Sequence, residues 1–349
     1  MASIIQNIKN KLLNLTQTLK KNIGILTSIL LILAFIIPFF ILYSLYPQSY
    51  EVTWKGRTYY LFFAWLIFIE LVLGWEKIRV NKLNKLKSIR NIAFIILLLL
   101  PTAYVVTANY YGLNTAIVDF AVKNNIPRAH EIPLSTEYLV FTIIFVLTLL
   151  LAYGREGLAI HSISAIFLGI IGLIYAVDCL YPYGAFTPFQ ILVPTTATLA
   201  AIVLNLMGYQ VEWEEPFLGT PVLKVWNQNG EAKAGIAWSC SGIDSLLIYS
   251  VTILLFLKDS GIPWRQRTIY FIIGAAITYF INVLRIVTIF IIGIDYGVGS
   301  PQWWRFHNYY GSLYSIVWIV IYPLLIMGTQ ILWRKIKSKG DSKNDIRFN

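Results

Sequence analysis

The sequence has few charged residues and only two cysteines, and each scarcity excludes a class of protein. Charged residues make up 13% of the 349 residues, whereas 57% are hydrophobic, and the mean hydropathy is +0.66. These values lie outside the range of ordinary soluble domains. Cys179 and Cys240 are too few for a disulfide framework and do not have Cys-x-x-Cys metal spacing. The composition predicts an integral membrane protein.

The motifs of nucleotide, metal and serine-hydrolase sites are also missing. The sequence has no Gly-rich phosphate loop, no His-Glu-x-x-His spacing and no Gly-x-Ser-x-Gly elbow. We therefore expect no metal and no cofactor. The net charge of +11 would suit nucleic acid, but the basic residues gather beside apolar runs, as they do at the cytoplasmic ends of membrane helices. We expect no nucleic-acid partner.

Apolar stretches recur along the whole chain, each near the ~20 residues that a helix needs to cross a bilayer. None alternates with a period of two, as the strands of a membrane barrel must. The sequence predicts an all-α polytopic membrane protein, a helical bundle of about eight or nine transmembrane segments. The stretches are 24–45, 59–75, 91–108, 138–153, 157–178, 188–209, 240–257, 268–292 and 312–333.

Lysine and arginine in the loops set the expected orientation. They crowd segments 77–90, 258–267 and 334–347. Placing these segments in the cytoplasm puts Cys240 at the extracytoplasmic face of the plasma membrane. Nine crossings that start inside would finish outside, so we expect one stretch within 138–209 not to cross.

A β-hairpin is predicted just before Cys240. Asn229-Gly230 is a strong two-residue hairpin signal between the flanking segments 222–226 and 231–236. An ordered loop without a role is the alternative. A hairpin at this place could hold an extended peptide by strand addition next to the cysteine.

Cys240 opens the seventh apolar stretch among small neighbours, Ser239, Ser241 and Gly242. Backbone N–H groups in a first helical turn lack internal partners, and the helix dipole favours negative charge there, so a thiolate would be stabilised. The alternative is a small apolar residue that fills a helix junction. Asp244, one turn further on, is a candidate for orienting His307 or pairing with Arg285.

Arg285 places a guanidinium inside the eighth stretch, at a cost on the order of 2.5–3.5 kcal/mol on insertion scales. Such residues usually face the bundle interior with a partner, and the alternative is snorkelling to the outer headgroups. A planar arginine fork suits a developing oxyanion or a substrate carboxylate. Asn282 lies three residues earlier on the same helical face and could orient it. Glu70 and Asp178 also lie at or near apolar segments, but the sequence shows no partner for either.

His307 follows an aromatic cluster, Gln302–Arg305, ahead of the last apolar stretch. Histidine titrates near neutrality, so it can take a thiol proton and later return it to a leaving amine. An interfacial histidine is the alternative. Helix-end positions place Cys240, Arg285 and His307 near the same leaflet. They are therefore our candidate catalytic residues, and Asn282, Asp244 and Arg305 are possible supporting ones.

Three ordered motifs carry a family resemblance. Residues 239–243 read Ser-Cys-Ser-Gly-Ile, residues 282–286 read Asn-x-x-Arg-Ile, and residues 307–311 read His-x-x-x-Gly. In this order and on the last three spans, they resemble the exosortase/archaeosortase family of membrane cysteine enzymes, and most closely an archaeosortase. The resemblance covers about 210–333.

The resemblance implies roles for the three candidates. Cys240 would be the nucleophile, Arg285 an essential partner, and His307 the third residue, a role that Arg305 could share or replace. The reaction would be that of a cysteine transpeptidase, which cleaves the carboxy-terminal sorting signal of a surface protein through a thioester acyl-enzyme. The substrate would carry a short motif, a transmembrane helix and a basic tail.

An amine acceptor, a membrane lipid in archaeal members, would then resolve the thioester. Two alternatives stay open. One is a membrane cysteine protease that uses water. The other is a transporter in which Arg285 and Asn282 bind an anionic solute.

These features predict five parts of the chain. They are a basic amphipathic cytoplasmic terminus (1–23), an N-terminal membrane bundle (24–209), an extracytoplasmic hairpin (210–236), a catalytic membrane core (237–333) and a basic cytoplasmic tail (334–349).

Overall fold

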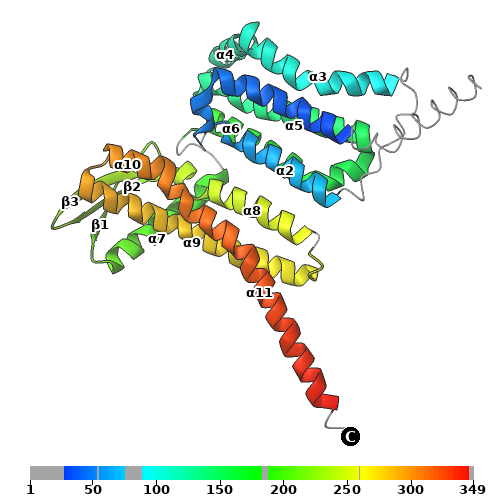
Figure 1. Cartoon of the computed structure of the whole chain (residues 1–349). Coiled ribbons are helices and arrows are strands. Elements are labelled where there is room, and N and C mark those ends of the chain that lie inside the picture. Colours follow the sequence, from blue (N-terminus) through cyan, green and yellow to red (C-terminus); the bar gives the residue numbers. More distant parts are fainter. Residues whose placement is uncertain (1–26, 53–54, 75–88, 183–187, 259, 346–349) are drawn as a thin grey trace, which may run out of the picture. The chain divides into compact units, whose positions relative to one another are not determined.

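The structure is a computed structural model that describes residues 27–52, 55–74, 89–182, 188–258 and 260–345. The chain forms two compact units, Met1–Pro182 and Tyr183–Asn349. Helices make up most of each unit, and the second unit also contains a small antiparallel sheet (Figure 1). The predicted all-α membrane fold with a small β element is confirmed. The predicted amphipathic terminus, 1–23, lies outside the described residues.

The first unit is a bundle of helices around an aromatic core. Phe35 packs edge to face against Phe63 and Phe145, with ring centroids 5.7 and 5.3 Å away. Gly154 kinks α5 with a φ of 68°, a value that glycine adopts readily. The elements are the helix Thr27–Leu45, η1 (Pro47–Tyr50), α2 (Thr58–Gly74), α3 (Ile89–Tyr110), α4 (Leu113–Lys123), η3 (Ala129–Glu131), α5 (Ile132–Ile160) and α6 (Ser162–Leu180).

Buried charges in the first unit are paired. Arg57 donates to both carboxylate oxygens of Glu137, over 2.8 and 2.9 Å. Asp178 forms ion pairs with Lys55 and with Arg128, the latter over 3.0 Å. Charges removed from water need such partners. Asp178 therefore has the partners that the sequence did not show.

Glu70 of α2 caps the neighbouring helix α6. Its carboxylate accepts hydrogen bonds from the backbone N–H groups of Ile163 and Ser164, over 3.2 and 3.0 Å. The first N–H groups of a helix have no partner within the helix, and the helix dipole favours a negative charge beside them. Glu70 therefore has a structural role in holding α2 to α6.

The second unit carries the segments with the three sequence motifs. Along the chain, a three-stranded sheet follows the first helix of this unit and precedes the other helices. The elements are η4 (Pro188–Ile191), α7 (Leu192–Leu206), β1 (Gln210–Phe217), β2 (Thr220–Asn227), β3 (Gly230–Gly235), η5 (Trp238–Cys240), α8 (Ile243–Lys258), α9 (Trp264–Tyr296), α10 (Pro301–Arg305), the π-turn η6 (Phe306–Tyr310) and α11 (Gly311–Asp345).

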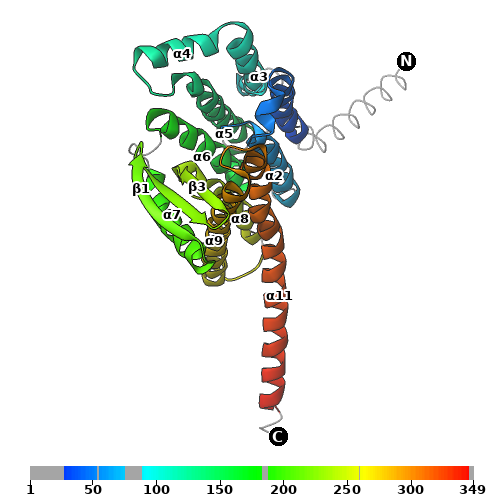
Figure 2. The ribbon, with the colours of Figure 1, turned by 90° about the vertical axis from the view of Figure 1, so that its left-hand side faces the viewer.

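The sheet has the strand order β1-β2-β3 and is antiparallel throughout. β2 and β3 pair from Val222 opposite Gly235 to Asn227 opposite Gly230, which confirms the predicted hairpin, but its two-residue turn is Gln228-Asn229 and not Asn229-Gly230. β1 adds a strand that we did not predict. Leu223 and Val225 of β2 are fully buried, and the sheet packs on α7 and α9 (Figure 2).

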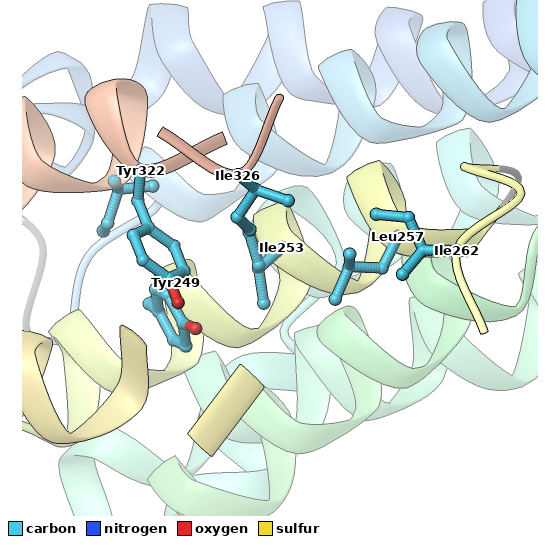
Figure 3. Close-up of a cluster of buried hydrophobic side chains, with 7 residues drawn as sticks. Tyr249, Ile253, Leu257, Ile262, Tyr322 and Ile326 are labelled. Atoms are coloured by element: carbon cyan, nitrogen blue, oxygen red, sulfur yellow. The ribbon is translucent and has the colours of Figure 1, made fainter. Parts of the chain in front are cut away.

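A second core fixes α8, α9 and α11 relative to one another. Tyr249 and Ile253 of α8 pack with Tyr322 and Ile326 of α11 (Figure 3). The hydroxyl of Tyr249 donates to a backbone carbonyl of α9 over 2.9 Å, and that of Tyr322 donates to another over 2.6 Å. Because one motif lies on α9 and the other two lie where α8 and α11 begin, this core sets the frame of the candidate site.

Each of the nine predicted apolar stretches coincides with a helix, and within the described residues six helices are long and apolar enough to cross a membrane. α9 is the longest of the six, with 33 residues and a length of about 50 Å. The six are Thr27–Leu45, Ile89–Tyr110, Ala129–Ile160, Ser162–Leu180, Trp264–Tyr296 and Tyr314–Trp333, and the shorter apolar helices are Thr58–Gly74 and Leu192–Leu206.

Candidate active site

Cys240 lies in a tight turn that the second unit holds by hydrogen bonds. The hydroxyl of Ser241 donates to the carbonyl of Trp238 over 2.6 Å. The buried amide of Asn282, on α9, donates to the carbonyl of Cys240 over 3.0 Å. Gly242 has a φ of +99°, and a Cβ there would lie 3.1 Å from the Asn282 amide. The turn therefore needs glycine, and Asn282 fixes the backbone of the cysteine.

His307 approaches the sulfur from the π-turn η6. Its Nε2 lies 3.8 Å from Sγ of Cys240, and its Nδ1 lies 3.1 Å from Oδ1 of Asn308. An amide oxygen only accepts, so Nδ1 carries the proton of the neutral ring and Nε2 presents its lone pair to the thiol. Trp303 stacks on the imidazole at a centroid distance of 5.1 Å. π-Turns recur at functional sites.

The electrostatic surroundings favour proton transfer from Cys240 to His307. Burial alone would raise the pKa of the Cys240 thiol, but the hydrogen bond to His307 and the charges of His307 and Arg285 outweigh it, and the pKa is lowered. Burial would lower the pKa of His307, but the bond to Cys240 and the charge of its thiolate outweigh that effect, and the pKa is raised. The opposite shifts favour a thiolate beside an imidazolium.

Arg285, half-buried on α9, packs against the backbone where α11 begins. Its Nη2 donates to the carbonyl of His307 over 2.9 Å. A Cβ on Gly311 would lie 2.7 Å from Nε of Arg285, so the guanidinium occupies the space that any side chain would need. Within the described part of the chain, the buried Nε has no hydrogen-bond partner. An unsatisfied buried donor costs about 1–3 kcal/mol, which a bound acceptor would recover.

The three supporting residues have different positions. Asn282 joins the site through Cys240, because its amide nitrogen donates to the cysteine carbonyl, whereas its buried Oδ1 accepts no hydrogen bond from Arg285 or from any other described residue. Asp244 is half-buried in the first turn of α8. Arg305 ends α10, is exposed, and makes no ion pair with any residue that the structure describes. The structure therefore groups Cys240, Arg285 and His307 with Asn282, and leaves Arg305 at the surface.

Sequence reasoning missed four residues of this cluster. The Ser239 hydroxyl lies 4.0 Å from the sulfur, Trp303 and Asn308 contact the imidazole, and Gly311 makes room for the guanidinium. Trp303 precedes His307 by four residues, a spacing that brings side chains together on a helix. That spacing was the available signal. Among the described residues, no group of three or more His, Cys, Asp or Glu could hold a metal ion.

Comparison with known proteins gives one match. The family model described as transmembrane exosortase matches residues 54–324, which is well over half of the chain and includes Cys240, Arg285 and His307. No curated protein and no solved structure matches the chain. The family relation supports an enzyme and not a transporter. The chain belongs to the transmembrane exosortase family, multi-pass membrane enzymes of the transpeptidase or protease type that act on proteins bearing sorting signals.

Proposed function

We propose that this protein is a cysteine transpeptidase of the archaeosortase type, which cleaves the carboxy-terminal sorting signals of surface proteins at the outer face of the plasma membrane. One observation carries the proposal. The sulfur of Cys240 lies 3.8 Å from Nε2 of a histidine whose other nitrogen faces an amide oxygen. A nucleophile beside a base that is itself oriented by a third group is the arrangement used for acyl transfer.

The first half of the proposed reaction forms a thioester. Nε2 of His307 takes the thiol proton as Sγ of Cys240 attacks the carbonyl carbon of the scissile peptide bond. The carbonyl oxygen becomes an oxyanion, which the guanidinium of Arg285 stabilises. The C–N bond then breaks, and the imidazolium gives its proton to the departing amine. The substrate's amino-terminal part stays on the sulfur as an acyl group.

The second half transfers that acyl group to an acceptor amine. His307 takes a proton from the amine, which attacks the thioester carbon and forms an amide. The C–S bond breaks, and the sulfur leaves as a thiolate that recovers a proton from the imidazolium. We propose the amine of a membrane lipid headgroup as the acceptor. If water attacks instead, the product is a free acid and the enzyme is a protease.

The geometry of α8 supports an outward-facing site. Cys240 precedes the first residue of α8, and Lys258 is its last residue, so the two mark opposite ends of one helix. Lys258, Arg265 and Arg267 flank the next turn of the chain, and basic loops favour the cytoplasm. A substrate with a membrane helix and a basic tail would lie in the same bilayer in the same orientation.

Replacing Cys240 tests the proposal. In cells that express Cys240→Ala or Cys240→Ser, we expect the uncleaved precursor of a membrane-anchored surface protein to accumulate. Cys179→Ala is the matched control, because Cys179 is the other free cysteine and lies in the first unit. Normal processing by Cys240→Ala would refute the proposal. The mass of the mature product separates an amide adduct from a free acid.

A further inference from the structure

One edge of β3 is left open by the pairing register of the sheet. The N–H of Ile236 donates to the carbonyl of Pro221 over 2.9 Å, so these two residues form a hydrogen-bonded pair. Such pairs alternate along an antiparallel ladder. The N–H and C=O groups of Glu231, Lys233 and Gly235 therefore point away from β2.

No described residue occupies these outward groups. Within the described ranges, the backbones of Glu231, Lys233 and Gly235 make no hydrogen bond outside the sheet, and all three residues are exposed. β2 and β3 pair without a register shift, and β3 contains no proline. Proteins block exposed edges with bulges, prolines or charged side chains, and of these β3 has only the charges of Glu231 and Lys233. We call the outward backbone groups of these three residues the β3 edge.

β3 runs beside α9 in the direction of Cys240. A Cβ on Gly230 would lie 3.0 Å from the carbonyl oxygen of Ile294, so β3 begins beside the end of α9. The carbonyl of Cys240 is bonded to Asn282, which lies about 18 Å back along the helix at 1.5 Å per residue. β3 therefore runs antiparallel to α9, and Cys240 follows Gly235 by five residues.

We propose that the β3 edge binds the extended segment of the substrate protein that precedes its scissile bond, as an added parallel strand. This inference rests on the proposed function. A substrate whose membrane helix follows the cleavage site must run toward the bilayer from its amino to its carboxy end, and β3 runs toward Cys240 in the same sense. Main-chain hydrogen bonds supply affinity in strand addition and read no side chain. The ligand is thus an extended peptide in which every second residue has a free N–H.

Lys233→Pro tests the edge from the enzyme side. It removes an outward N–H and leaves the hydrogen bonds to β2 in place, because the N–H of Lys233 does not face β2. Edge strands tolerate proline at such positions. Lys233→Ala is the matched control, since it removes the side chain and keeps the N–H.

The substrate probe is the precursor that accumulates with Cys240→Ala. We expect cleavage by Lys233→Pro to be about tenfold slower than by Lys233→Ala, because a main-chain bond is lost and the ring blocks the strand. Iodoacetamide should alkylate Cys240 at the same rate in both variants, which shows an intact site. Equal cleavage by the two variants would overturn the proposal.

A proline scan of the precursor tests the same edge with the native enzyme. If Lys233→Pro alters the alkylation of Cys240, its site is disturbed, and the scan alone then tests whether the substrate binds the β3 edge. In a parallel pair, every second residue of the added strand donates its N–H to β3. Proline should therefore block cleavage at alternate positions upstream of the cleavage point. Loss of cleavage without a period of two, or uniform tolerance, would refute docking on β3. Failure of the proposed function would give a different result from failure of docking on β3, because no precursor would then accumulate with Cys240→Ala.

Discussion

Gly311→Ala should impair the enzyme by displacing Arg285. The new Cβ would lie 2.7 Å from Nε of Arg285 and 3.0 Å from the carbonyl oxygen of Phe306. The backbone oxygen cannot retreat without distorting the π-turn, so the guanidinium must move. Overpacking of this kind costs about 1–3 kcal/mol, which corresponds to a loss of about 5- to 150-fold in kcat/KM if the strain falls on the reacting geometry.

Gly328→Ala is the matched control on the same helix. Nothing lies within 4 Å of a Cβ at Gly328, and both substitutions raise helix propensity equally. The assay is kcat/KM for cleavage of the precursor that accumulates with Cys240→Ala. Thermal unfolding in detergent shows whether each variant is folded. If Gly311→Ala cleaves as fast as Gly328→Ala, the packing of Arg285 against α11 does not matter for the reaction.

Three further substitutions test other contacts. Arg285→Lys loses the planar fork that bonds His307 and that we propose as the partner of the oxyanion, so we expect about 100-fold slower cleavage, whereas full activity would mean that charge alone suffices. His307→Ala should shift the pH midpoint of Cys240 alkylation upward and slow alkylation at neutral pH, because His307 lowers the pKa of Cys240. An unchanged midpoint would contradict the interaction between Cys240 and His307. Glu137→Ala leaves Arg57 buried without its carboxylate and should destabilise the first unit by about 3–5 kcal/mol, measured by unfolding in detergent; a negligible change would show that the pair is not needed.

The helices could be predicted because hydrocarbon imposes a strong local rule. A helix that crosses a bilayer needs a long apolar run, and such runs are visible in the sequence alone. The β2–β3 hairpin was predictable for a similar reason, because residues that favour turns lie between its two strands. The turn itself is Gln228-Asn229, one residue earlier than predicted, and neither Asn229 nor Gly230 has a positive φ. β1 was not, because it contains three glutamates and Pro216, residue types depleted in strands, and its pairing with β2 shifts between Glu214 and Phe217.

Contacts between distant segments set the limit of prediction. The cap that Glu70 provides for α6 joins residues more than 90 positions apart. Asn282 also makes a contact with a residue far away in the sequence. Its spacing from Arg285 suggested a local bond, but its amide reaches Cys240, 42 positions away. Helix packing determines such contacts. The sequence motifs identified residues of the site but not the residues that each one contacts.

The acyl-enzyme is the most direct test of the account. The enzyme should be incubated with the precursor that accumulates with Cys240→Ala, quenched in acid and analysed by intact and peptide-level mass spectrometry. We predict a mass increase equal to the acyl part of the substrate on the peptide that contains Cys240, which hydroxylamine removes as expected for a thioester. The adduct should be absent from Cys240→Ala. Processing that continues with no adduct on Cys240, or with an adduct on another residue, would contradict the account.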